Sequence, residues 1–226
     1  MTTTTKHRPQ PGPRERPILF TGEMIRALLA GTKTQTRRVE PLPSLLHPGL
    51  TLRGCPNGRA YYDNSSRSPA FEIGPRYGVP GDSLYPREAF APRPGGGYLY
   101  RADDERAAPR WKPGIHMPKE ASRIRLPIAA HERVERLVDI SEEDARAEGV
   151  KPEGTGPTPY RDAYLRLWDS INGERGFPVT LNPWVRVVTF ERAIRVPVKN
   201  PLLGDSALAI TTPVPATTKR RAGETP

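Results

Sequence analysis

The chain has 226 residues, of which 35% are hydrophobic and 7% aromatic, and it contains 20 glycines and 28 prolines. So much glycine and proline disfavours a helical bundle and favours a loop-rich α+β fold or a β-barrel. No apolar run approaches the roughly 18–20 residues of a membrane-spanning helix, so we expect no membrane partner. The polar start does not resemble a secretory signal, and the single cysteine, Cys55, excludes an intramolecular disulfide framework. These features predict a cytoplasmic protein.

The formal net charge is +10, which points to an anionic partner. The excess is spread along the chain: residues 1–15 carry +2, residues 16–192 carry +5 and residues 193–226 carry +3. A moderate basic excess on a mixed-charge surface is compatible with nucleic acid or nucleotide ligands. An ordinary solvated surface has the same composition, so charge alone leaves both interpretations open.

Composition divides the chain into three parts. Residues 1–15 are polar and proline-rich, and we expect a disordered arm there. Residues 193–226 mix proline, threonine and alanine with a basic triplet, Lys219–Arg221, and predict a disordered tail. The folded domain is expected at residues 16–192. It contains an irregular stretch at about 41–80, which predicts a loop excursion with one short hairpin around Tyr61 and Tyr62.

The first regular elements are expected between Thr21 and Ala102. Thr21 is a suitable N-cap, Gly31 a suitable end, and four apolar residues between them share one helical face: Met24, Ile25, Leu28 and Leu29. The threonine-rich segment after this helix predicts an extended strand. Alternating patterns predict further short strands. The three strand ranges are Lys33–Val39, Leu84–Glu88 and Tyr98–Ala102.

The second half of the domain predicts strands and helices in alternation. Arg123–Val134 has the longest alternating pattern, and Pro127 within it predicts an edge position or a bulge. Ser141 predicts the N-cap of a short helix that ends at Gly149. In the helix predicted at Tyr160–Ile171, we expect one face to pack in the core through Tyr164, Leu167 and Trp168. Trp184–Phe190 predicts a closing strand.

Several familiar kinds of chemical site are missing from the sequence. His47, His116, His131 and Cys55 are scattered without the spacing of a transition-metal site, so we expect no metal. There is no Gly-x-Gly-x-x-Gly or Walker-type loop, and Gly95–Gly97 is better explained as the tip of a hairpin. There is also no Gly-x-Ser-x-Gly nucleophile elbow. The sequence therefore predicts no cofactor and no serine triad.

One basic cluster stands out in residues 31–38, whose sequence is Gly-Thr-Lys-Thr-Gln-Thr-Arg-Arg. It resembles the Gly-x-Lys-x-x-Thr-x-Arg signature of the ASCH domain, a PUA-like family. The matching residues are Gly31, Lys33, Thr36 and Arg38.

Further phrases follow in the same order as in the phage and prophage branch of that family. Residues 80–85 (Pro-Gly-Asp-Ser-Leu-Tyr) with Arg87 and Glu88 resemble its Pro-Gly-Asp strand, and similar phrases occur at 140–150, 167–172 and 182–185. The resemblance covers roughly residues 16–192. Two departures are the Tyr-Pro pair at 85–86, in place of an aromatic and β-branched pair, and an apparent insertion at 59–76.

The resemblance implies a PUA-like mixed β-barrel with short capping helices, within the α+β class. It also implies a basic cleft that binds RNA or a nucleoside-like ligand in a bacterial host cell. The ligand-binding residues would be Gly31, Thr34, Arg37, Arg38, Arg87 and Glu88.

One bacterial branch of the family removes the acetyl group of N4-acetylcytidine with a Lys, a Thr and a Glu. The resemblance places these roles at Lys33, Thr36 and Glu148. Lys33 would take the proton of Thr36, which would attack the amide carbonyl, while Glu148 would orient or protonate the leaving amine.

Two alternatives to this enzyme remain open. The cations can simply bind phosphate, with Thr36 occupying a strand position and Glu148 balancing charge. In a regular strand Lys33 and Thr36 would point to opposite faces, so their cooperation requires a turn or bulge at residues 34–35. The second alternative is a phage assembly or host-interaction role that uses the surface of the protein. The sequence does not indicate its protein partner.

Overall fold

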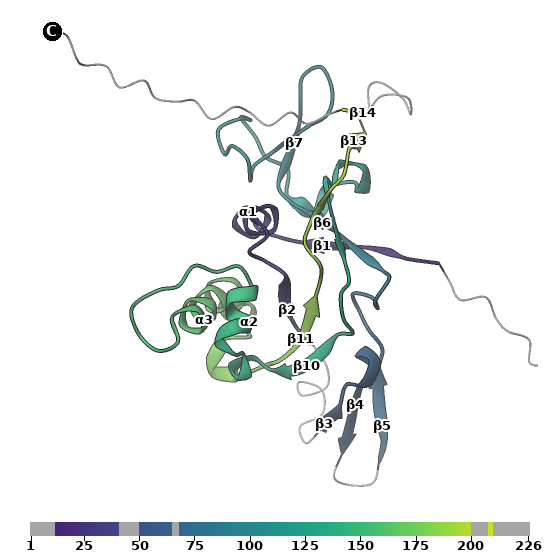
Figure 1. Cartoon of the computed structure of the whole chain (residues 1–226), viewed down its shortest axis with the longest axis vertical. Helices are drawn as coiled ribbons and strands as arrows, with labels where there is room; N and C mark the ends of the chain where they lie inside the picture. The colour runs from purple at the N-terminus through teal and green to yellow at the C-terminus, as the bar shows by residue number, and fades with distance from the viewer. Residues whose placement is uncertain (1–11, 41–49, 65–67, 200–207, 210–226) are drawn as a thin grey trace, which may run out of the picture.

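The computed structural model describes residues 12–40, 50–64, 68–199 and 208–209 (Figure 1). Within these residues the protein has a mixed α+β architecture with several small sheets and few helices. The strand pairing forms no closed barrel in the described part of the chain. No helix among the described residues is both long and apolar enough to cross a membrane.

Two sheets form the centre of the molecule. The first has the order β1-β6-β9-β12, in which β1 and β6 are parallel and the other pairs are antiparallel. The second is antiparallel with the order β10-β11-β2. An isolated bridge between Ile128 and Phe190 links the two sheets. Their strands are β1 (Glu15–Leu19), β2 (Gln35–Val39), β6 (Ser83–Arg87), β9 (Ile124–Pro127), β10 (Arg133–Arg136), β11 (Trp184–Thr189) and β12 (Ile194–Arg195).

The helices begin and end where the local sequence predicts. Helix α1 (Gly22–Ala30) is capped by the Thr21 hydroxyl, which accepts from the Met24 amide, and Gly31 follows it with a left-handed φ of 74°. Helix α2 (Glu142–Ala147) is capped in the same way by Ser141. Helix α3 (Pro159–Asn172) packs beside α2, as Figure 1 shows. The short 3₁₀ turns are η1 (Pro56–Gly58), η2 (Gly114–His116), η3 (Lys119–Ala121), η4 (Leu137–Asp139), η5 (Gly173–Arg175) and η6 (Val179–Leu181).

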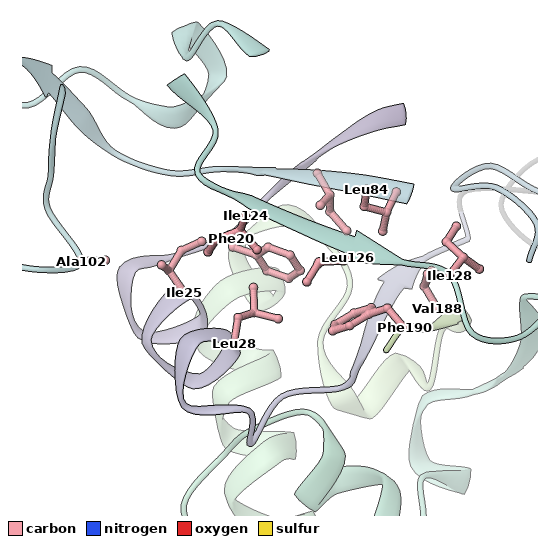
Figure 2. Packing of buried hydrophobic residues seen from close by; sticks show 11 residues of the cluster. Phe20, Ile25, Leu28, Leu84, Ala102, Ile124, Leu126, Ile128, Val188 and Phe190 are labelled. Carbon is pink, nitrogen blue, oxygen red and sulfur yellow. The ribbon is translucent and has the colours of Figure 1, made fainter. Parts of the chain in front are cut away.

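The main core lies between α1 and the two central sheets (Figure 2). Ile25 and Leu28, one turn apart on α1, are buried against strand side chains and the loop residue Phe20. The core is completed by strand residues, by the two bridge residues Ile128 and Phe190, and by Ala102; the strand residues are Ile18, Leu84, Ile124, Leu126 and Val188. Helix α1 thereby fixes the position of the chain that leaves its C-terminus and becomes β2.

A second core lies under α2 and α3. Tyr164 and Trp168 are buried there with Val185 of β11, which confirms their predicted packing. Leu167, which was expected to pack in the core with them, is only partly buried. Leu167 directly precedes Trp168 in the sequence, and it lines the pocket that is described below.

The irregular stretch at 41–80 contains more structure than the hairpin expected around Tyr61 and Tyr62. Strands β3 (Leu50–Gly54), β4 (Ala60–Asn64) and β5 (Ser68–Ile73) form an antiparallel three-stranded sheet. Tyr62 is fully buried and packs in a cluster with Val134 of β10. Arg186 of β11, which donates to Gly58 O between β3 and β4, is fully buried and pairs with Glu40 at 2.5 Å and with Glu132 at 2.9 Å.

Two small hairpins lie at the end of the molecule that is drawn at the top of Figure 1. Strands β7 (Phe90–Pro92) and β8 (Tyr98–Tyr100) pair, as do β13 (Val198–Lys199) and β14 (Leu208–Ala209). Val198 is buried against Phe90 and Met117. The expectation of disorder from residue 193 onward is therefore wrong for 193–199, because β12 and β13 pair with other strands. Lys219–Arg221 lies outside the described residues.

The expected strand Arg123–Val134 is two strands, and this prediction is wrong. Strand β9 ends at Pro127 and β10 begins at Arg133, in a different sheet. Past the proline, the Ile128 amide donates to Asp82 O and the Ala129 amide donates to Thr189 O, so the chain leaves one sheet for the other. Pro127 is the last residue of β9 and pairs with Ser83 of β6, whereas β12 pairs only with Ile124 and Arg125.

Candidate functional site

The signature segment is irregular just before β2. Gly31 turns the chain back, and the amides of Thr32 and Lys33 both donate to Ala27 O. Strand β2 begins only at Gln35, while Lys33 forms an isolated bridge with Glu148. Lys33, Gln35 and Thr36 are all buried, so both faces of this segment are covered by the rest of the protein.

Lys33 and Glu148 form a buried ion pair. Lys33 Nζ donates to Glu148 Oε2 and to Glu148 O, both at 2.8 Å, and the two residues are 1% and 5% exposed. Burial lowers the pKa of Lys33, and the Glu148 carboxylate offsets this only in part. The ammonium is therefore easier to deprotonate than an ordinary surface lysine.

A short helix and a glycine set the position of Glu148. It follows directly after α2, whose start is fixed by Ser141, and the next residue, Gly149, has a left-handed φ of 81°. A Cβ on Gly149 would lie 2.8 Å from Lys33 Cβ and 2.9 Å from Ala27 Cβ. Only glycine gives both the turn and the close approach that bring Glu148 onto Lys33.

Arg37 is the centre of a buried charge network. Its guanidinium, with no exposed side-chain surface, donates to Glu148 at 3.1 Å, to Asp144 at 2.7 Å and to Glu135 at 2.8 Å. Burial alone would lower the pKa of Arg37, but Glu148 and Glu135 help to raise it overall. Lys33 and Arg37 are thus already neutralised by protein carboxylates. Their contacts do not leave them as free cations for an anionic ligand.

Arg38 has a different environment from the other two cations of the signature. One of its terminal nitrogens, Nη2, donates to Leu19 O at 2.6 Å, and its guanidinium carbon lies 5.1 Å from the centre of the Phe20 ring. Among the described residues, no carboxylate pairs with Arg38, and its buried Nε has no hydrogen-bond partner. Its orientation is fixed by the protein while its charge remains uncompensated.

A pocket of about 340 Å³ lies over these residues, between β2, α3 and the segment before β6. Thr36, Arg37, Arg38 and Glu148 all reach it, whereas Lys33 lies behind Glu148 and does not line it. The other lining residues are mostly aromatic, aliphatic or basic: Met24, Val39, Arg76, Tyr77, Tyr164, Leu167, Trp168, Ile171, Asn172, Arg175 and Phe177. This arrangement offers an apolar floor with polar groups at one side, as small-molecule sites do.

Glu132 holds one wall of this pocket. Its buried carboxylate accepts from the backbone amides of Tyr77 at 2.5 Å, Gly78 at 3.1 Å and Arg76 at 3.2 Å. Arg186 donates to the same carboxylate. The side chains of Arg76 and Tyr77 therefore project into the pocket from a segment whose backbone is anchored at three successive amides.

The structure does not bring Arg87 and Glu88 to this pocket. Arg87 Nε donates to Met117 O at 2.7 Å, and Glu88 pairs with Arg123 at 2.9 Å in a separate buried cluster. Burial raises the pKa of Glu88, and Arg123 offsets part of the shift. Neither residue lines the pocket, so the two form a structural cluster apart from the signature.

Gly31 and Thr34 act through their backbones. Gly31 supplies the left-handed cap of α1. The Thr34 amide donates to Ala147 O at 2.9 Å, and its carbonyl accepts from the Phe190 amide at 3.0 Å. Thr34 therefore ties the signature to α2 and β11, and it is not among the pocket-lining residues.

In the described part of the chain, no group of three or more His, Cys, Asp or Glu residues is placed to hold a metal ion. His116 and His131 are exposed, and Cys55 is half-buried, with its thiol donating to Glu132 O. Burial raises the pKa of that thiol. His47 lies outside the described residues.

Sequence reasoning predicted only Thr36, Arg37, Arg38 and Glu148 as site residues among those that line the pocket. The residues that it missed include Arg76, Tyr77, Arg175 and Phe177. Arg175 belongs to no pattern, and nothing in the sequence marks it. Arg76 and Tyr77 precede the Pro-Gly-Asp phrase by a few residues, which was a usable signal because that phrase belongs to the resemblance. The buried Arg186 also had a signal, since it stands in the middle of an apolar run, Val185 to Val188.

Comparison with known proteins adds no relative. No protein-family model matches the chain, and neither a curated protein nor a solved structure matches it.

Proposed function

We propose that the protein binds RNA or a nucleoside-like ligand in the pocket over β2, as a phage-type ASCH protein. The observation that carries the proposal is the pocket itself. It brings the signature residues Thr36 and Arg38 together with Glu148, and about 340 Å³ is a suitable volume for one nucleoside. The half-buried Tyr77 and Phe177 offer aromatic faces for a base, and Thr36 and Glu148 offer polar atoms for its edge.

A PUA-like barrel is part of the same proposal. Two features support it: the Ile128–Phe190 bridge joins the two central sheets, and the Glu191 amide donates to Pro127 O next to it. Helix α1 and the α2–α3 pair then act as the caps that the resemblance implies.

Isothermal titration calorimetry with a panel of ribonucleosides, N4-acetylcytidine and short single-stranded RNAs tests the binding function. We expect at least one nucleoside-containing ligand to bind with a stoichiometry of one. Thr36→Val should weaken its binding, because it removes a hydroxyl that faces the pocket and keeps the β-branched shape. The matched control is Thr180→Val, which changes an exposed threonine away from the pocket. If no member of the panel binds, the proposed function is wrong.

An amidohydrolase is the second candidate, and the contact between Lys33 and Glu148 favours it. When neutral, Lys33 has two N–H groups, and Glu148 O and Oε2 provide an acceptor for each. Its lone pair would then accept the proton of Thr36 Oγ. No hydrogen bond joins the two side chains among the described residues, so this transfer requires them to come together when substrate binds. Attack of Thr36 on the acetyl carbonyl, followed by protonation of the leaving amine, would yield cytidine and an acyl-threonine that water hydrolyses to acetate.

Incubation of the purified protein with N4-acetylcytidine, followed by chromatography for cytidine, tests this candidate. We expect Thr36→Val and Lys33→Met to abolish product formation, while Thr34→Val, which lies beside them but off the pocket, retains it. Absence of turnover by the unaltered protein would leave the pocket as a binding site only.

A further inference from the structure

The charged residues at and beside the pocket fall into two groups. In the first, Lys33, which lies outside the pocket lining, and Arg37, which lines it, are compensated by Glu148 together with Glu135 and Asp144. In the second, at the mouth, Arg38, Arg76 and Arg175 reach the pocket from three separate segments of the chain. None of these three pairs with a carboxylate of the described residues. The opening therefore carries an excess positive charge that the protein does not itself neutralise.

Two of the three arginines are held by contacts that direct them. The Phe20 ring and Leu19 O fix Arg38, so that part of its guanidinium remains available. The backbone of Arg76 is anchored on both sides, because its amide donates to Glu132 and its carbonyl accepts from Arg16 at 2.7 Å. The guanidinium of Arg38, held in this way, can form paired hydrogen bonds to a tetrahedral anion without much loss of side-chain entropy. For Arg76 the anchored backbone fixes only the point from which the exposed side chain extends.

We propose that the pocket selects phosphorylated nucleosides, with the phosphate bound at the mouth by Arg38, Arg76 and Arg175. This inference rests on the proposed function, and it narrows the ligand from a nucleoside to a nucleotide unit. The apolar floor takes the base, and the uncompensated guanidinium groups take the phosphate. A neutral nucleoside fills the floor but leaves the mouth without a partner. Arg76 and Arg175 lie outside the basic signature, so the selection depends on residues that the signature does not contain.

The test compares each ribonucleoside with its 5′- and 3′-monophosphates by calorimetry at low salt. We expect a monophosphate to bind about tenfold or more tightly than its nucleoside, since each charge-assisted hydrogen bond contributes at this level. The preference should decline as salt rises. A dinucleotide in the same series distinguishes the two sources of phosphate: tighter binding than the monophosphates indicates a polymer ligand, and weaker binding indicates a free nucleotide.

Double variants identify the residues that cause the preference for monophosphates over nucleosides. Arg76→Ala with Arg175→Ala should bring the affinities for monophosphate and nucleoside together, whereas the nucleoside affinity itself should change little. The matched control is Arg93→Ala with Lys112→Ala, which removes the same charge from exposed residues beside the β7–β8 hairpin. It should retain the preference.

The outcomes separate the two proposals. Equal affinities for nucleoside and monophosphate overturn this inference and leave the proposed function standing. An equal loss in both double variants also overturns it, because the effect would then come from overall charge. Failure of every nucleoside and nucleotide to bind overturns the proposed function together with this inference.

Discussion

Burial forces the charged side chains beneath the pocket to compensate one another. Lys33 and Arg37 have almost no exposed surface, and an unpaired charge in such a place would be costly. Each is therefore in contact with at least one carboxylate, and Glu148 serves both. Arg133 extends the network through its own contact with Asp144. A variant that removes one member leaves its neighbour buried without a partner.

Lys33→Met tests the protonation of this lysine through stability. Because burial lowers the pKa of Lys33 below its usual value of 10.5, the unfolded chain holds its proton over a pH range in which the folded protein has lost it. Stability rises with pH wherever the unfolded state binds more protons. The unfolding free energy of the unaltered protein, relative to Lys33→Met, should therefore increase as the pH rises toward that value.

Urea unfolding at several pH values from neutrality upward measures this difference. Subtracting the variant removes the contributions of the other titrating groups. A difference that is flat or falls with pH would show that Lys33 stays charged throughout, which would also exclude it as a base near neutral pH.

The sequence was enough to predict which residues belong to the basic signature, but not which side chains those residues contact. The resemblance placed Lys33 and Glu148 at one site, and they are in contact. Nothing local indicated that Arg37 would be compensated by Glu135 and Asp144, which lie about a hundred positions away. The chemical role of an arginine depends on such distant partners, so a residue pattern alone overstates how many cations remain for a ligand.

At the scale of elements, those with complete local signals were predicted well. Helices α1 and α2 each have a hydroxyl N-cap and a glycine just past the end. The strand after Pro183 was also predicted, because its apolar run is bounded on both sides. The segment 123–134 was not, since its alternation continues across the place where the chain passes from one sheet to the other. Which sheet a strand joins is decided by pairing, and periodicity does not show it.

Gly149→Ala tests how the end of α2 positions the site. Its φ of 81° is strained for alanine, and the new Cβ would meet two other Cβ atoms that cannot rotate away. The matched control is Gly154→Ala, where φ is 79° and nothing lies within 4 Å. Both variants lose the left-handed glycine, at about 1–2 kcal/mol each. We expect Gly149→Ala to be less stable than the control by a further amount of about 1–3 kcal/mol, the usual cost of overpacking.

Thermal and urea unfolding measure both variants side by side. Equal destabilisation of the two would show that the contact with Lys33 and Ala27 relaxes freely. Glu148 would then not be held in place by close packing.

At the scale of the whole molecule, the parts are connected through buried contacts that cross between sheets. Arg186 of β11 joins Glu40, at the end of β2, to Glu132 and to Gly58 O beside the β3–β5 sheet. Helix α1 packs on both central sheets at once (Figure 2). Because these contacts share strands, loss of one part should weaken the others. We expect the described sheets to unfold together.

Leu126→Ala tests this cooperativity. Leu126 is fully buried in the core between α1 and the central sheets, so its truncation should cost about 2–5 kcal/mol. Leu181→Ala is the control, because Leu181 is 50% exposed and truncation at the surface usually changes stability by about 0.5 kcal/mol or less. Trp168 reports on the core under α3, and Trp184 reports on the cluster beside the β3–β5 sheet. Urea unfolding is followed in two backgrounds, each of which retains only one of these tryptophans. In both backgrounds Leu126→Ala should shift the unfolding midpoint by the same amount. That shift should equal the one measured by far-ultraviolet circular dichroism. A transition at Trp184 that keeps its midpoint would mean that the β3–β5 side of the molecule folds independently, and that the Arg186 contacts do not couple it to the pocket.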